Sequence, residues 1–68
     1  MNEETFNMSI RKFLKNVGVR SQAEIERAVA KALAEGKLKG NEALPAHIEL
    51  TLPGIGLKFV VDGEIRLD

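Results

Sequence analysis

The sequence predicts a small α+β domain in which two N-terminal amphipathic helices pack on one face of a three-stranded antiparallel β-meander, in the order ααβββ. Three observations support this prediction. Apolar residues before Gly40 recur at helical spacing, apolar residues after it alternate with polar ones, and two turn clusters interrupt the alternating part. A chain of 68 residues leaves room for one domain, which we expect to span residues 1–68.

The first predicted helix covers about residues 3–17. Asn2 is a suitable N-cap, and Glu3 and Glu4 suit the positive end of the helix dipole. The apolar residues of this segment fall on one side of a helix, namely Phe6, Ile10, Phe13, Leu14 and Val17. Gly18 is the expected stop, because glycine readily adopts the left-handed conformation that ends many helices.

The second predicted helix covers about residues 22–35. Ser21 and Glu24 have the spacing of a capping box, in which the side chain of each residue accepts a hydrogen bond from the backbone amide of the other. An apolar side follows, made of Ile25, Ala28, Val29, Ala32 and Leu33, and Gly36 closes the helix. The short linker 18–20 predicts that the two helices form a helical hairpin or corner.

Three strands are expected at about residues 47–52, 57–61 and 64–67. A four-residue turn at 53–56 would place Leu50 opposite Phe59, with the apolar residues of both strands on one face. Asp62-Gly63 is the second turn signal. We prefer a three-residue loop with a bulge at Gly63 over a two-residue type I′ turn, because only the bulged loop brings Ile65 to the apolar face.

The composition restricts the classes of protein to consider. Without cysteine the chain has no disulfide, thiolate metal site or cysteine nucleophile. Its formal net charge is zero, although residues 1–40 carry eight basic and five acidic residues and residues 41–68 carry two and five. The polar, acidic N-terminus resembles no targeting signal, and no apolar run approaches a membrane span. We therefore expect a cytoplasmic protein that compensates for its small core by association.

No catalytic, cofactor or metal site can be assembled from the sequence, so we expect no enzyme and no cofactor. His47 is the only histidine and has no ligand or nucleophile at a recognisable spacing. The two serines are Ser9 and Ser21, and Ser21 is explained as a cap. Gly54 and Gly56 lie between two strands and precede no helix, which favours a hairpin turn over a phosphate-binding loop.

Two functions from different classes remain. The first is a non-enzymatic interaction module, either a homodimer or a small partner-binding protein, with a candidate interface on the second helix at Ala23, Arg27, Ala30 and Ala34. The edge of the last strand is another candidate interface. The alternative is a winged-helix-like nucleic-acid-binding protein, whose candidate contacts are Arg11, Lys12, Lys15, Arg20 and Arg27. The neutral net charge favours the first function.

Several segments resemble a small family of short bacterial proteins. They are residues 6–19, Ser21-Gln22, residues 24–26, residues 32–38, Leu44-Pro45 and residues 62–65, in the order found in that family. The resemblance spans nearly the whole chain. It implies a bacterial, cytoplasmic domain of unknown function without assigned active-site residues.

Overall fold

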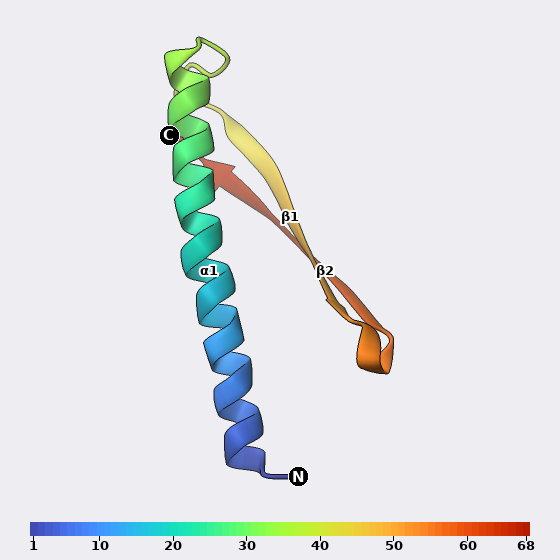
Figure 1. Cartoon of the computed structure of the whole chain (residues 1–68). Helices are drawn as coiled ribbons and strands as arrows, with labels where there is room; N and C mark the ends of the chain where they lie inside the picture. The colour runs from blue at the N-terminus through green and yellow to red at the C-terminus, as the bar shows by residue number, and fades with distance from the viewer. The chain divides into compact units, whose positions relative to one another are not determined.

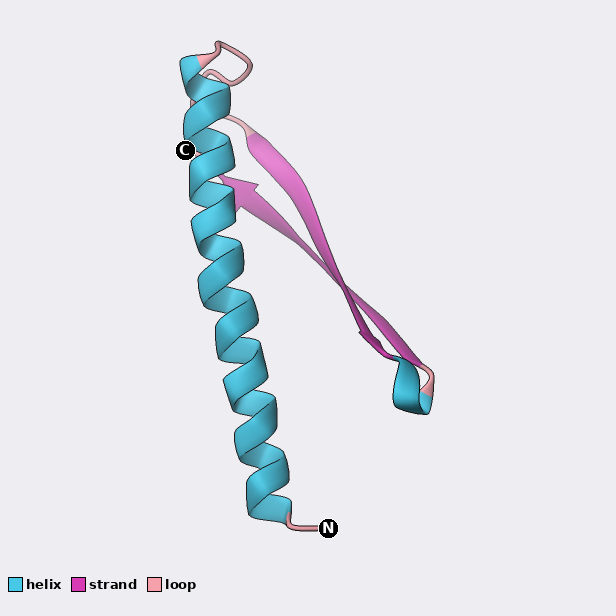
Figure 2. Ribbon diagram, in the orientation of Figure 1, coloured by secondary structure: helices cyan, strands magenta, loops and turns pink.

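The computed structural model describes all residues from Met1 to Asp68. One long helix, α1 (Glu3–Ala34), is followed by strand β1 (Ala43–Leu52), a short 3-10 helix η1 (Pro53–Ile55) and strand β2 (Leu57–Arg66) (Figure 1). The chain divides into two compact units, Met1–Lys37 and Leu38–Asp68. The first unit is entirely helical, and the second is a β-hairpin (Figure 2).

The predicted pair of helices is wrong, because α1 runs without interruption through the segment 18–20 that was expected to be a linker. Its start agrees with the prediction: the side chain of Asn2 accepts a hydrogen bond from the Thr5 amide at 3.0 Å. Gly18 lies inside the helix and has a negative φ. Glycine in a helix interior costs only about 0.5–1 kcal/mol relative to alanine, which is too little to stop a helix of this length.

The predicted capping box at Ser21 and Glu24 is also absent. A capping box stabilises amides that have no helical partner, whereas the amides of a helix interior bond the carbonyl four residues earlier. Glu24 instead pairs with Arg27, with 2.6 Å between Oε1 and Nη1. Local cap chemistry is worth about 1 kcal/mol, so it does not break a helix that continues favourably on both sides.

Seven of the ten residues on the two predicted apolar sides form one stripe on α1, and Phe13, Val29 and Leu33 fall outside its spacing. We call it the α1 stripe: Phe6, Ile10, Leu14, Val17, Ile25, Ala28 and Ala32, with Ser21 in the gap. Successive members are separated by four, four and three residues in a repeating pattern, which keeps them on one side of a continuous helix. This shared phase on both sides of Gly18 is consistent with one helix and argues against a turn.

The end of α1 agrees with the sequence. Gly36 adopts φ +74, its amide bonds the Leu33 carbonyl at 3.1 Å, and the Lys37 amide bonds the Ala32 carbonyl at 2.8 Å. These two bonds form a Schellman motif, in which a left-handed residue allows the last free carbonyls to be satisfied. A side chain at Gly36 would be strained by this positive φ.

The hairpin register between β1 and β2 is the predicted one. Ile48 lies opposite Val61, Leu50 opposite Phe59 and Leu52 opposite Leu57. The connecting turn consists of η1 and Gly56, whose φ of +68 and amide bond to the Pro53 carbonyl at 3.2 Å reverse the chain. The resulting ribbon is strongly twisted, as two-stranded sheets usually are (Figure 1).

The predicted third strand and its bulged turn are wrong, because β2 continues through Asp62 and Gly63 to Arg66. β1 begins at Ala43, four residues earlier than predicted, and therefore supplies pairing partners for residues 62–66. Gly63 pairs with Ala46 and has no positive φ. The sheet therefore has two strands and is not a meander. Both strands are edges, which is where proline at position 45 is tolerated.

No side chain of the chain is buried. Residues expected in the core are open to solvent, including Phe59, which is 55% exposed, and Phe13, which is 56% exposed. The predicted ααβββ domain, in which two helices cover a three-stranded sheet, is therefore replaced by a helix and a hairpin whose apolar residues remain accessible.

Candidate interaction surfaces

One face of the hairpin consists only of apolar residues and one glycine. Directly paired residues of an antiparallel ribbon point to the same side, and successive residues of a strand point to opposite sides. Applied to the register, this rule defines the hairpin apolar face: Leu44, Ala46, Ile48, Leu50, Leu52, Leu57, Phe59, Val61, Gly63 and Ile65. Ile48, Phe59 and Val61 are about half exposed, at 48%, 55% and 55%. The sheet therefore presents a continuous apolar surface.

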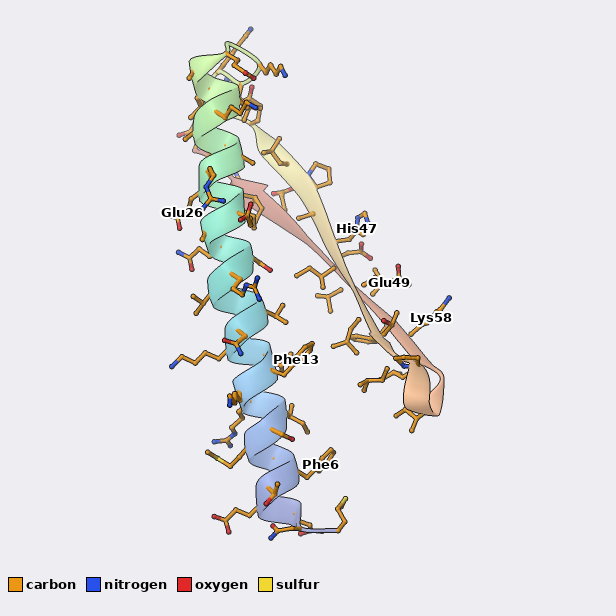
Figure 3. All side chains as sticks on the ribbon, in the orientation of Figure 1. Phe6, Phe13, Glu26, His47, Glu49 and Lys58 are labelled. Atoms are coloured by element: carbon orange, nitrogen blue, oxygen red, sulfur yellow. The ribbon has the colours of Figure 1, made fainter.

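The other face of the hairpin is largely polar. His47 lies opposite Asp62, Thr51 lies opposite Lys58, and Glu49 lies between them along β1. Figure 3 shows His47, Glu49 and Lys58 on the same side of the ribbon. This alternation is typical of a sheet that has one face in water and the other against protein. The pattern is thus that of a hairpin whose apolar face packs against another protein surface.

The α1 stripe is the second apolar surface. Phe6 is 49% exposed, Ile10 38%, Leu14 50% and Ile25 38%. Phe6 and Phe13 project from one side of α1 and Glu26 from the opposite side (Figure 3). The stripe repeats every 11 residues: Phe6, Val17 and Ala28 occupy equivalent positions, as do Ile10, Ser21 and Ala32. An 11-residue repeat is close to three helical turns, so the stripe follows the helix axis.

The interface expected at Ala23, Arg27, Ala30 and Ala34 lies on α1 away from the stripe, and all four residues are exposed. Arg27 forms a solvent-exposed ion pair with Glu24, and such pairs contribute little to stability. This side offers only alanine methyl groups, whereas the stripe offers phenylalanine, isoleucine and leucine. Its role as an interface stays a prediction, and the α1 stripe is the larger apolar surface.

The basic residues proposed for nucleic-acid contact all lie on α1 and are exposed: Arg11, Lys12, Lys15, Arg20 and Arg27. At 100° per residue, Arg11, Lys12 and Lys15 share one side of the helix, whereas Arg20 and Arg27 lie on another. The continuous α1 contains no turn between two helices, so the helix pair that the winged-helix-like alternative needs is absent. Nothing in the structure favours nucleic-acid binding.

The residues considered for catalysis do not form a reactive cluster. The Ser9 hydroxyl donates to the Phe6 carbonyl at 2.8 Å, as helical serines often do. Ser21 lies inside α1, and no group of three histidine or acidic side chains comes together. A shallow groove runs along the first turns of α1, but one helix alone lines it, with Asn2, Glu4, Thr5, Met8, Ser9, Arg11, Lys12 and Lys15.

One polar arrangement was missed by the sequence reading. The carboxylate of Glu42 accepts hydrogen bonds from the amides of Lys39 at 2.9 Å, Gly40 at 3.0 Å and Asn41 at 3.2 Å. The Lys39 amide, followed by that of Gly40, holds the pKa of the Glu42 carboxyl below its usual value of 4.5. Gly40, with φ +106, permits the turn that points these amides at one acceptor. The only sequence signal was an acidic residue two positions after a glycine.

The comparison with protein families covers the chain completely. Residues 1–68 match DUF6494, a family of unknown function. The chain belongs to this family. The resemblance noted from the sequence, to a family of unknown function, is thereby confirmed. Comparisons with curated proteins and with solved structures return no match.

Membership in DUF6494 assigns no activity to any residue, so a functional inference has to come from the surfaces described above. α1 is not apolar enough along any stretch of sufficient length to cross a membrane. The main surface features of this DUF6494 chain are two exposed apolar surfaces, the α1 stripe and the hairpin apolar face.

Proposed function

We propose that the chain is a protein-interaction module rather than an enzyme, and that it binds another polypeptide through its exposed apolar surfaces. The hairpin apolar face carries this proposal, because every position on it is apolar or glycine while the opposite face is largely polar. Exposed contiguous apolar patches of this kind commonly mark protein–protein interaction sites. The cytoplasm stays the predicted location.

The energetics support the same function. A two-stranded hairpin is at best marginally stable in water when nothing covers its apolar face. Covering a side chain such as Phe59 contributes about 1.5–3 kcal/mol, and several such residues share the face. Binding a partner would therefore stabilise the hairpin itself, so that partner binding and hairpin stability are linked.

The first test compares two aspartate variants at neighbouring positions of β2. Phe59→Asp places a charge on the hairpin apolar face, whereas Val60→Asp places the same charge on the polar face at a residue with similar exposure, 51% against 55%. The immobilised chain is incubated with extract of its native host, and the retained proteins are identified by mass spectrometry. We expect the wild type and Val60→Asp to retain the same partner, which can be another protein or further copies of this chain. Phe59→Asp should lose that partner.

Amide hydrogen exchange provides an independent measurement. Amides of β1 and β2 should exchange slowly in the bound wild type and in Val60→Asp, and rapidly in Phe59→Asp, because a hairpin without a covered face opens readily. Equal capture and equal exchange in the two variants would show that the hairpin apolar face binds nothing.

A further inference from the structure

The backbone of β2 carries a row of hydrogen-bonding groups with which no other strand pairs. The Leu67 amide bonds the Glu42 carbonyl, and hydrogen-bonded pairs alternate with non-bonded pairs along an antiparallel ladder. The residues of the non-bonded pairs point their N–H and C=O groups away from the hairpin. On β2 these residues form what we call the β2 edge: Lys58, Val60, Asp62, Glu64 and Arg66.

The outer edge of β1 is interrupted, whereas the β2 edge is complete. The outward residues of β1 are Ala43, Pro45, His47, Glu49 and Thr51. Pro45 has no N–H to donate, so a strand added beside β1 would lose a ladder hydrogen bond at that position. Every residue of the β2 edge offers both an N–H and a C=O group. An additional strand therefore fits β2 better than β1.

We propose that the β2 edge pairs with the β2 edge of a second copy of this chain, antiparallel and with the two Val61 residues directly opposite each other. The product is a four-stranded sheet in the order β1-β2-β2-β1 with twofold symmetry. Directly opposite residues point to the same side of a sheet, so the two hairpin apolar faces become one surface. The inference rests on the proposed function as an interaction module and names a second copy as the partner.

In this register the apolar sides of the two strands are complementary. Phe59 lies opposite Gly63 of the second copy, Leu57 lies opposite Ile65, and Val61 meets its own counterpart on the twofold axis. A large aromatic ring opposite a glycine covers backbone that the glycine leaves open. The other two contacts join aliphatic side chains, which pack well across strands.

The polar sides of the two strands are complementary in the same register. Lys58 lies opposite Glu64 of the second copy, and the twofold axis repeats this contact. Opposite charges directly across a strand pair stabilise it, and like charges destabilise it. Val60 lies opposite Asp62, so no like charges face each other.

The neighbouring registers match less well. With Asp62 on the twofold axis, Asp62 would face its own counterpart and Lys58 would face another cation. With Val60 on the axis, only residues 57–63 of each copy would pair, instead of residues 57–65. The charges of the β2 edge therefore exclude one shift, and the length of the ladder disfavours the other.

Two proline variants test the β2 edge. Val60 and Glu49 form a non-bonded pair of the hairpin, so Val60→Pro and Glu49→Pro each remove an outward N–H and no hydrogen bond between β1 and β2. Sedimentation equilibrium of the full-length chains should show dimers of twice the 7.5 kDa chain mass for the wild type and Glu49→Pro. Val60→Pro should raise the dissociation constant at least about tenfold, because the Val60 N–H of each copy bonds the other.

Cysteine cross-linking tests the register, because the chain has no native cysteine. Val61→Cys sets two cysteines in a non-bonded pair, whose Cα atoms lie about 4.5 Å apart, within reach of a disulfide. Ile48→Cys is the matched control on the same face, with an exposure of 48% against 55%, but its two copies would lie about 14 Å apart. We expect at least about tenfold more cross-linked dimer from Val61→Cys than from Ile48→Cys.

Three outcomes would overturn the inference. The first is a strict monomer of 7.5 kDa in sedimentation of the wild type at micromolar concentration. The second is equal self-association of Val60→Pro and Glu49→Pro. The third is cross-linking of Val61→Cys that is no better than that of Ile48→Cys, or is exceeded by that of Val60→Cys, which would place Val60 on the axis.

The proposed function can be judged separately from this pairing. It would survive a monomeric wild type if Phe59→Asp still abolished capture of a different protein, and it would fail otherwise. Val60→Asp remains a valid control for capture of wild-type copies. It adds one like-charge contact, with Asp62 of the second copy, which should weaken capture less than about fivefold.

Discussion

The carboxylate of Glu42 accepts a hydrogen bond from the backbone amide of Gly40 at 3.0 Å and further hydrogen bonds from the amides of Lys39 and Asn41. The Glu42 carbonyl in turn accepts a hydrogen bond from the Leu67 amide at 2.9 Å, which continues the pairing of the two strands beyond Ala43 and Arg66. One residue therefore organises the turn before β1 with its side chain and extends the hairpin ladder with its backbone.

Hairpin stability should fall in acid because of Glu42. Its pKa is lowered in the folded state, chiefly by the Lys39 amide, so the ionised carboxylate contributes stability above the unfolded pKa of about 4.5. This contribution is lost as the pH falls through the lower folded pKa. Melting curves of the wild type and Glu42→Gln between pH 7 and pH 3 should differ at pH 7 and converge below pH 4.5. A constant difference between them would contradict this role.

Gly18→Ala should stabilise α1 by about 0.5–1 kcal/mol, because alanine is the better residue in a helix interior. Apart from the adjoining residues and the backbone of the helix itself, no atom lies within 4 Å of the position that a Cβ would take at Gly18. Helix content by circular dichroism and the thermal midpoint should both rise. Had residue 18 been a left-handed helix stop, the same change would be destabilising, so a lower midpoint would favour two helices.

Glycines 56 and 63 should respond in opposite ways to alanine. Gly56 has φ +68, where a Cβ costs about 1–2 kcal/mol, so Gly56→Ala should destabilise the hairpin. Gly63 lies in β2 with no positive φ and with open space around its Cβ position, so Gly63→Ala should be neutral or stabilising. Strand amide exchange would measure both. Strong destabilisation by Gly63→Ala would instead indicate a turn at Asp62-Gly63.

Ile25→Asp should strongly weaken the proposed binding of a partner to α1, a second copy of this chain included, whereas Glu26→Asp should not. Ile25 belongs to the α1 stripe, and burying an unpaired carboxylate there would cost more than about 2 kcal/mol, at least tenfold in the dissociation constant. Glu26 projects from the opposite side of α1 (Figure 3). Titration of the partner retained from host extract against the immobilised chains would compare the variants with the wild type. Equal dissociation constants for all three would exclude the stripe from the interface.

Patterns that depend on neighbouring residues were read correctly from the sequence. The cap at Asn2, the helix end at Gly36 and the pairing of Leu50 with Phe59 all follow from a few adjacent side chains. The alternation of β1 and β2 also predicted that their apolar residues share one face. The α1 stripe and the hairpin apolar face were both visible in the sequence as apolar periodicity. The sequence analysis assigned them to a core.

Two local signals pointed to turns that do not form. The capping box at Ser21 offers about 1 kcal/mol to a helix start, and the Asp62-Gly63 pair favours a tight chain reversal. At Ser21 the competing structure is a helix whose apolar stripe continues in phase past Gly18, and at Gly63 it is a β1 that extends back to Ala43 and pairs with residues 62–66. A local preference of that size is outweighed by the hydrogen bonds and side-chain alignment of a continued helix or strand.

Periodicity, Gly36 and the turn at 53–56 were enough to show where helix gives way to strand and how residues 48–52 pair with residues 57–61 on one apolar face. The three-dimensional structure was needed to show that there is one helix and one hairpin, and that neither unit buries a side chain. Periodicity records which side of an element avoids water, and that side looks the same whether another segment of the chain or another molecule covers it.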